Sequence, residues 1–244
     1  MQSLATNRYD SYNSAMKKME RYQALQVLRE AEWLKDFSAD LIGKLVTEGR
    51  LVYLNIGEWA QAEGDDRNGL FVVIDGLLQS FCAAPGDREV MIGFAEPGSV
   101  LGHATRYSGG PRLVTAVCAQ PSILLEVSES ALDRIAIDSP EIWRAIAGFA
   151  YAHVRRALRM AAEVISLRPR ERIAARLLAT VGDSPVAEVP MINISQEMLG
   201  EMIGVTRKTV NLHLSAFERD GLVRVGYGKI ELCDLNGLKL IANG

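Results

Sequence analysis

The sequence has few cysteines and few histidines, and this scarcity excludes several kinds of site. Its three cysteines, Cys82, Cys118 and Cys233, are far apart and form no C-x-x-C pair. Three thiols cannot all pair within one chain, so we expect reduced, buried cysteines and neither a cysteine-ligated zinc site nor an iron–sulfur cluster. The three histidines lack the H-x-D or H-x-H pattern with a distant third histidine that metal enzymes of the double-stranded β-helix class need. We therefore expect no metal site and no enzymatic activity.

Long apolar runs are also missing. The longest fall far short of the ~20 residues that a transmembrane helix needs. The first segment, MQSLATNRYDSYNSAMKKME, contains no hydrophobic stretch of the kind that a secretory signal requires. These absences predict a cytoplasmic protein with no membrane partner.

Charge is close to balanced, with a formal net charge of −3, but it is distributed unevenly. Residues 1–138 carry 13 Lys and Arg against 19 Asp and Glu, whereas residues 139–167 carry 4 against 2. Residues 168–244 carry 10 against 9. A polyanionic partner would therefore prefer the C-terminal part of the chain.

The N-terminal part predicts one helix followed by a series of short strands. Residues 13–36 place apolar side chains near a period of 3.6, at Met16, Met19, Leu25, Leu28 and Trp33. From about residue 41 to residue 127, short apolar runs alternate with turns that contain Gly, Pro or Asp. Such a pattern is typical of an antiparallel sandwich, barrel or jelly roll.

A long helix is predicted from Ser139, a capping residue, through Pro140, which suits the first helical position, to the residues before Pro169. Residues that recur at spacings of three and four form one narrow stripe along it. The stripe predicts either a helix packed on its own domain or, as we favour, the seam of a two-stranded coiled-coil dimer. The predicted dimer interface is Ile142, Ile146, Phe149, His153, Ala157, Met160 and Val164.

Residues 194–222 predict a helix, a tight turn and a second helix, after a separate helix in residues 168–183. Ser195 and Thr206 are good N-caps for the two helices. Gly204 suits the left-handed residue that ends the first helix. Gly200, inside that helix, indicates a close approach of a second helix, because glycine there otherwise costs ~1 kcal/mol.

The second of these helices has Val210, Leu214 and Phe217 on one face, and it is followed by a hairpin. GLVRV and KIELC flank the glycine turn GYG, which predicts a β-hairpin wing. Asp234 can cap a last short helix. A small structural or protein-interaction domain is the alternative to a DNA-binding module with this pattern.

In a helix-turn-helix, the second helix lies in the major groove with its N-terminal residues at the base edges. This arrangement directs Arg207, Lys208 and Asn211 towards bases or phosphates, and Arg207 is the best candidate for a bidentate contact to guanine. The predicted contacts to the DNA backbone are Ser195, Gln196, Thr206, Thr209 and Lys229. For each charged residue, the alternative is a solvated surface side chain.

Three blocks resemble the cyclic-AMP receptor protein / fumarate–nitrate regulator (Crp/Fnr) superfamily of bacterial transcription factors. They read LNIGEWAQAEGDDRNGLFVVIDGLLQSF, PGSVLGHATRYSGGPRLVTAV and ISQEMLGEMIGVTRKTVNLHLSAFERDGLVRV, within a resemblance that covers roughly residues 35–242. The resemblance implies an α+β fold with an N-terminal antiparallel β-roll, similar to the cyclic-nucleotide-binding jelly roll, a long dimerisation helix and a C-terminal winged helix-turn-helix. The expected domains are residues 1–138, 139–167 and 168–244.

The resemblance also implies a homodimer that binds double-stranded DNA at a near-palindromic operator and contacts RNA polymerase. Half-sites ~34 Å apart would match the two-fold axis of the dimer. A signal in the β-roll would reposition the two recognition helices, which requires the ligand to bind one arrangement better than the other.

The chain departs from the cyclic-AMP-binding members at the effector site. In those members Gly-Glu opens a loop that closes with Arg followed by Ser or Thr, and two residues of the long helix offer hydroxyls to the adenine. The corresponding residues in this chain are Gly102, His103, Arg112, Leu113, Ala157 and Leu158. Only Arg112 supplies a matching polar group, so we expect no binding of cyclic AMP at physiological levels.

Haem sensing, or sensing of another small molecule or of redox state, stays open as an alternative. Some gas-sensing members place a haem-ligating histidine near this loop, which makes His103 the candidate and His153 a weaker one. A lone histidine is more often a hydrogen-bonded structural residue. A regulatory nucleotide-binding protein without DNA binding is a further alternative, against which the complete helix-turn-helix and wing argue.

The recognition helix departs from the family too. Members commonly have Glu after the first Arg and a second Arg one turn later, whereas this chain has Lys208 and Leu212. Glutamate accepts a hydrogen bond from cytosine, but lysine has no acceptor. We therefore expect an operator that differs from the common family consensus.

Overall fold

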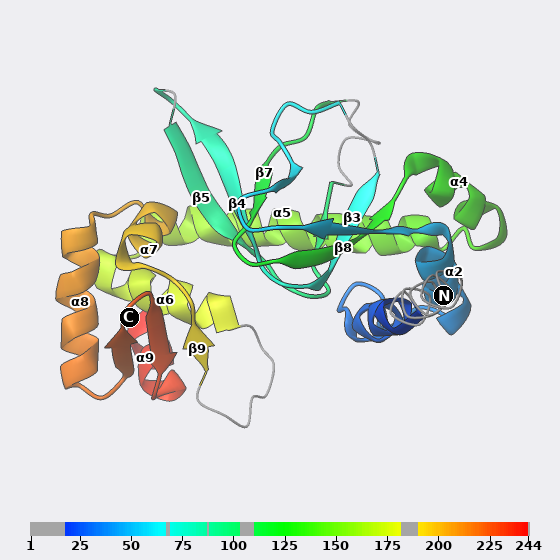
Figure 1. The fold of residues 1–244 in the computed structure, drawn as a ribbon. Helices are drawn as coiled ribbons and strands as arrows, with labels where there is room; N and C mark the ends of the chain where they lie inside the picture. Colours follow the sequence, from blue (N-terminus) through cyan, green and yellow to red (C-terminus); the bar gives the residue numbers. More distant parts are fainter. Residues whose placement is uncertain (1–17, 67–68, 87, 103–109, 182–189, 244) are drawn as a thin grey trace, which may run out of the picture. The chain divides into compact units, whose positions relative to one another are not determined.

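The computed structural model describes residues 18–66, 69–86, 88–102, 110–181 and 190–243. The chain forms two compact units, and Figure 1 traces their elements in chain order. The first unit is Met1–Asp87 with Gly93–His153, and the second is Arg88–Ile92 with Val154–Gly244. The division falls inside the long helix, so that helix contributes residues to both units.

The first unit begins with two helices where one had been predicted. Residues 18–30 are helical. After them, hydrogen bonds join residues three apart: the Leu34 N–H donates to the Ala31 carbonyl, and the Phe37 N–H donates to the Leu34 carbonyl. The predicted helix thus ends six residues early, and its portion before residue 18 lies outside the described residues. The second helix, α2 (Ala39–Glu48), starts at Ser38, whose Oγ accepts the Leu41 N–H at 3.2 Å.

The expectation of strands from about residue 41 was wrong for α2. Its apolar run LIGKLV reads equally well as a strand, but the buried residues follow helical spacing. They are Leu41, Ile42, Leu45 and Val46.

Eight strands in the described ranges form two four-stranded sheets. The first has the order β1 (Arg50–Leu54), β8 (Ser122–Val127), β3 (Leu70–Asp75), β6 (Val100–Leu101). The second has the order β2 (Trp59–Gln61), β7 (Thr115–Cys118), β4 (Leu78–Ala84), β5 (Arg88–Ala95). Pairing within both sheets is antiparallel, for example Val52 with Leu124 and Gln79 with Val117.

The first sheet contributes side chains to an apolar cluster on each face. Neighbouring residues of a strand point to opposite faces, so Leu124 joins the apolar cluster shared with β4 and β7, while Leu125 joins the cluster that includes the helices. Val73 and Val72 of β3 divide in the same way. The predicted antiparallel β-roll is confirmed, with helices on its outer side.

Two helices follow β8. The first, α4 (Glu129–Asp138), was not predicted and is capped by Ser128. The second is the long helix α5 (Ile142–Ser166). Ser139 does not cap α5 as expected, because it terminates α4 and its buried Oγ accepts a hydrogen bond from Lys44 Nζ at 3.0 Å. At the start of α5, main-chain hydrogen bonds join residues three apart, for example from the Trp143 N–H to the Pro140 carbonyl.

The second unit holds a compact winged helix module. Its helices are α6 (Pro169–Val181), α7 (Gln196–Ile203), α8 (Arg207–Arg219) and α9 (Leu235–Ala242). Its strands β9 (Met191–Ile192), β10 (Val223–Gly226) and β11 (Lys229–Leu232) form a sheet in the order β10-β11-β9. The predicted helix-turn-helix, wing and Asp234-capped last helix are confirmed, and β9 is an additional strand.

Among the described residues, none of the helices is both long enough and apolar enough to span a membrane.

Candidate nucleic-acid interface

Side-chain caps define the turn between α7 and α8. Ser195 Oγ accepts the Met198 N–H at 3.1 Å, and Thr206 Oγ1 accepts the Thr209 N–H at 3.2 Å. Between them, Gly204 has a φ of 69°, a left-handed conformation that a residue with a Cβ adopts only at a cost. The start of α8 is therefore fixed by local interactions that the sequence specifies.

Gly200 is needed by the turn rather than by a crossing helix. A Cβ at this position would lie 2.7 Å from the Val205 carbonyl oxygen, and the Val205 N–H donates to the Gly200 carbonyl at 2.9 Å. The close approach that the sequence predicted is confirmed, but the neighbour is the main chain of the turn.

The helix α8 has one buried face and one exposed face. Val210, Leu214 and Phe217 are buried and hold the helix against the module. The opposite face follows the helical spacing i, i+1, i+4, i+5, i+8. It consists of Arg207, Lys208, Asn211, Leu212 and Ser215, all exposed.

This exposed face, which we call the α8 outer face, presents hydrogen-bond donors and one apolar group. The Ser215 hydroxyl donates to Asn211 Oδ1 at 3.1 Å, so the Asn211 amide directs its two N–H donors outwards. Arg207 and Lys208 carry donors only. Leu212 is 66% exposed and supplies the apolar group.

His213 lies on the flank of α8 and is partly buried. Burial lowers the pKa of its imidazole from the usual 6.5, and the nearby positive charge of Arg170 lowers it further. The neutral form of His213 is therefore favoured in the folded protein.

The wing adds polar groups beside α8. Glu218 Oε1 of α8 accepts the Val225 N–H at 2.8 Å, which fastens the hairpin to the helix. Lys229 is exposed at the first position of β11, whereas Arg224 is engaged by Glu231 at 2.6 Å. Tyr227, in the turn of the wing, is fully exposed. The sequence motif GYG could have identified this tyrosine as a surface group, but it was not among the predicted contacts.

The residues predicted to bind an effector are only partly brought together. Arg112 is 3% exposed, and its guanidinium donates to Gln61 Oε1 at 2.8 Å and to the Gly69 carbonyl at 3.5 Å. It also lies 5.5 Å from the centre of the Phe71 ring. Gly102 lies directly against this guanidinium. Arg112 thus sits inside the β-roll, bound to polar groups of the protein itself.

The other effector candidates are exposed or lie outside the described residues. Leu113 is 67% exposed, and Ala157 and Leu158 are exposed on the part of α5 that belongs to the second unit. His103 lies outside the described residues. His153 is exposed, and its ring packs edge-on against Phe149 at 5.4 Å. Within the described ranges, no group of three His, Cys, Asp or Glu side chains could hold a metal ion.

The predicted dimer stripe on α5 requires a correction in its first half. Ile142, Ile146 and Phe149 are buried in the core of the first unit, which leaves them almost no exposed surface to offer a second copy. The later positions His153, Ala157, Met160 and Val164 are at least partly exposed. The alternative that we had considered, a helix packed on its own domain, holds for the first half.

A second stripe, on the other side of α5, is exposed throughout. At 3.6 residues per turn, it runs nearly opposite the buried residues. Its spacing alternates between four and three, as in a coiled-coil seam. The stripe consists of Ala147, Tyr151, Val154, Leu158, Ala161 and Ile165, all of them exposed. Sequence reasoning missed it because both stripes have similar spacing.

Comparisons with known proteins agree with both units. Residues 51–139 match a family model described as a cyclic nucleotide-binding domain, and residues 171–241 match a Crp-like helix-turn-helix domain. The transcriptional regulatory protein btr of Bordetella pertussis is 29% identical over 181 residues, which cover 72% of this chain and 74% of btr.

Two further relatives extend the likeness over most of the chain. The CRP-like cAMP-activated global transcriptional regulator of Mycobacterium tuberculosis is 24% identical over 204 residues, 82% of this chain and 91% of that protein. The structure of FixK2 from Bradyrhizobium japonicum superimposes with a TM-score of 0.69 at 21% identity, over 79% of this chain and 96% of FixK2. The structural likeness is one of fold.

Proposed function

Because this chain belongs to the Crp/Fnr superfamily of transcription regulators, which are not enzymes, we propose that it binds a near-palindromic DNA operator as a homodimer. The α8 outer face would enter the major groove of each half-site. Ser195, Gln196, Thr206, Thr209 and Lys229 would contact the phosphate backbone. The observation that carries this proposal is the exposure of Arg207, Lys208, Asn211 and Leu212 on one face of a helix whose other face is buried.

The chemistry of the α8 outer face restricts the bases that it can read. Arg207 and Lys208 can donate to O6 and N7 of guanine. Leu212 can make an apolar contact to the C5-methyl group of thymine. The face contains no carboxylate that could accept a hydrogen bond from the N4 amino group of cytosine. We therefore propose a half-site in which the recognition helix faces guanine and thymine edges.

Selection of operators from a random DNA library by the full-length protein tests this proposal. We expect a two-fold symmetric consensus, and we expect Arg207→Ala to bind it about 10 to 100 times more weakly, since a bidentate guanine contact contributes about 1–3 kcal/mol of discrimination. Leu212→Ala should relax the preference at one thymine. Ser130→Ala, in α4 of the first unit, is a control. Recovery of the unaltered family consensus, or no DNA binding at all, would count against the proposal.

The exposed stripe from Ala147 to Ile165 is the proposed dimer seam, in place of the stripe first predicted. Its alternating spacing and its exposed Tyr151, Val154, Leu158 and Ile165 support this assignment. Contact of the DNA-bound dimer with RNA polymerase is a further part of the proposal, and in vitro transcription from a promoter that carries the selected operator tests it.

We also propose that cyclic AMP is not the effector of this protein. The sequence supports this, since Leu113 stands in place of the hydroxyl residue. The hydrogen bonds from Arg112 to Gln61 and to the Gly69 carbonyl also support it, because they occupy the guanidinium. A phosphate would have to replace these bonds. Isothermal titration calorimetry should therefore detect no micromolar binding of cyclic AMP. Measured binding at that level would overturn this part of the proposal.

A further inference from the structure

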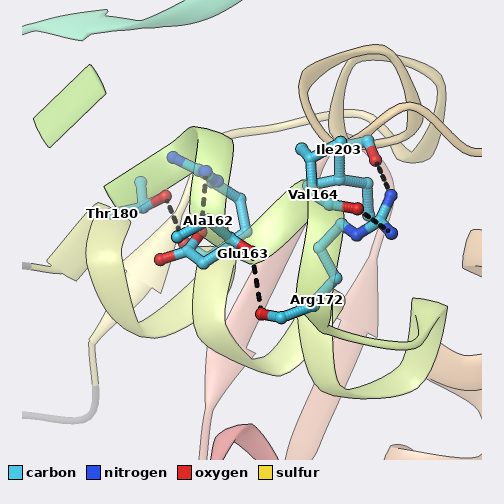
Figure 2. A network of polar contacts seen from close by, with 8 residues as sticks. Ala162, Glu163, Val164, Arg172, Thr180 and Ile203 are labelled. Atoms are coloured by element: carbon cyan, nitrogen blue, oxygen red, sulfur yellow. Dashed lines mark hydrogen bonds and ion pairs between the residues drawn. The ribbon is translucent and has the colours of Figure 1, made fainter. Parts of the chain in front are cut away.

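Three helix segments of the second unit meet at the guanidinium of Arg172, near the start of α6. Its Nη1 donates to the Ile203 carbonyl at 2.8 Å, and its Nη2 donates to the Val164 and Leu167 carbonyls, each at 2.9 Å. Figure 2 shows the side chain reaching from α6 towards Val164 on one side and Ile203 on the other. One side chain thus binds the end of α5 and the end of α7.

All three acceptors are carbonyl groups at the C-terminal ends of helices. The last four carbonyls of a helix have no partner within the helix, and they carry the negative end of the helix dipole. Val164 lies in the last turn of α5 and Leu167 directly follows it, while Ile203 is the last residue of α7. A guanidinium that binds all three satisfies these acceptors and places its charge where two helix dipoles favour it.

A second arginine strengthens the same connection one turn later on α6. Arg176 Nη2 donates to Glu163 Oε2 of α5 at 3.0 Å, and the two side chains are only 7% and 13% exposed. The last turns of α5 are therefore held to α6 at two successive positions.

We propose that Arg172 is a positioning residue that fixes the turn of the helix-turn-helix against the C-terminal end of α5. Ile203 precedes the left-handed Gly204, and Thr206 caps the recognition helix α8, so the carbonyl that Arg172 holds lies three residues before the cap of α8. The division of the chain agrees, because the part of α5 from Val154 onward belongs to the second unit. The end of α5 and the recognition helix then move together.

Arginine is suited to this role because its donors diverge in a planar fork. Carbonyls on two different helices are reached from the two terminal nitrogens of one rigid group. A lysine ammonium is a single point on a flexible stem and cannot span both helix ends in the same way. Arg172→Lys therefore keeps the charge but removes the bridge.

The proposal rests on the proposed function and adds a consequence for operator geometry. In a dimer paired along α5, the distance between the two recognition helices depends on how firmly each α8 is tied to its α5. Loss of the Arg172 bridge should leave each module able to bind a half-site but should weaken the preference for one half-site spacing.

The experiment compares full-length wild type with Arg172→Lys and Arg172→Gln. Arg168→Gln is the matched control, because Arg168 is an exposed residue just before α6 whose substitution removes the same charge. Affinity is measured for a single half-site, for the selected full operator, and for operators with one or two base pairs inserted between the half-sites.

We expect both Arg172 variants to bind the half-site with an affinity within about twofold of wild type. The full operator should be bound about tenfold more weakly, which is the loss of affinity expected when one charge-assisted hydrogen bond is removed. We also expect the penalty for inserted base pairs to shrink in both variants and to be unchanged in Arg168→Gln. An unchanged spacing profile, or an equal loss of half-site and full-operator affinity, would overturn the positioning role.

Amide hydrogen exchange tests the same contact without DNA. Both Arg172 variants should lose protection in residues 164–168 and 203–206 together, while α9 stays protected; retained protection in either segment overturns the proposal. If wild type itself shows no preference for half-site spacing, the proposed dimeric operator binding fails, and the exchange result alone then decides whether Arg172 joins the two helix ends.

Discussion

The first part of α5, from Ile142 to Phe149, is held in place by apolar packing. Its residues Ile142, Ile146 and Phe149 are buried in the core of the first unit. In its last turns the same helix is anchored by guanidinium groups, which bind Glu163 and the Val164 carbonyl. Apolar burial is non-directional and roughly proportional to the area removed from water. Hydrogen bonds require particular distances and angles. Apolar packing at the start of α5 therefore mainly stabilises the fold, whereas the hydrogen bonds at its end mainly fix the position of the helix.

Removing the largest apolar anchor of the first half should have the largest effect on stability. Phe149 packs edge-on against Trp33, with ring centres 5.6 Å apart. Phe149→Ala should lower the free energy of unfolding of the first unit by about 3–5 kcal/mol, measured by urea denaturation. Tyr22→Ala, at an aromatic residue of the same unit that is 64% exposed and lies outside the proposed dimer seam, is the control. Equal losses in the two variants would contradict the assignment of Phe149 to the core of the first unit.

Breaking the ion pair at the other end should cost nearly as much, for a different reason. Arg176→Met leaves the carboxylate of Glu163 buried without its partner, which typically costs about 3 kcal/mol or more. Because an apolar pair can replace a buried ion pair at little cost, the double variant Glu163→Leu/Arg176→Met should regain most of that loss. The prediction fails if the single variant loses less than about 1 kcal/mol, the value expected of an exposed pair.

A charge on the exposed stripe should affect assembly and leave folding intact. Leu158 is 67% exposed, so Leu158→Glu should change the unfolding of the monomer little. We expect a monomer in sedimentation and an operator affinity about 100-fold weaker, since two linked modules bind more tightly than one. Ala152→Glu introduces the same charge at an exposed position outside the stripe and should remain dimeric. A dimeric Leu158→Glu variant would remove this stripe from the interface.

The smallest effect concerns the pH dependence of the second unit. The pKa of His213 is lower in the folded state than its usual 6.5, so the unfolded state binds more protons once the pH falls below about 6.5. Stability contributed by neutral His213 is therefore complete above pH 6.5 and decreases as the pH falls towards the lowered pKa. Melting temperatures at pH 7.5 and 5.5 should differ less in His213→Asn than in wild type. An identical difference in both proteins would show that His213 does not contribute.

The helix-turn-helix could be predicted closely because its signals are local. Ser195, Gly204 and Thr206 each act within a few residues of their own position, so the sequence of three or four residues is sufficient to place a cap or a turn. The wing was predictable for the same reason, from two β-type runs around GYG.

Features that depend on distant partners were not predictable. The two stripes of α5 have similar spacing, and only the packing of the first unit decides that Phe149 is inside and Tyr151 outside. The acceptors of Arg172 are main-chain carbonyls, which every residue possesses, so no residue type marks them. The inward position of Arg112 likewise depends on Gln61, which lies in β2, 51 residues earlier in the chain.

The close packing of Gly102 against Arg112 limits how the sequence can change at these two positions. A Cβ at this position would lie 1.7 Å from Nη1 of Arg112, and its φ of 86° already favours glycine. No side chain can therefore be acquired at position 102 while the arginine keeps its inward conformation. Among descendants of this gene, we expect replacements of Gly102 to occur only together with, or after, the loss of Arg112, so that these two positions change as a pair rather than independently.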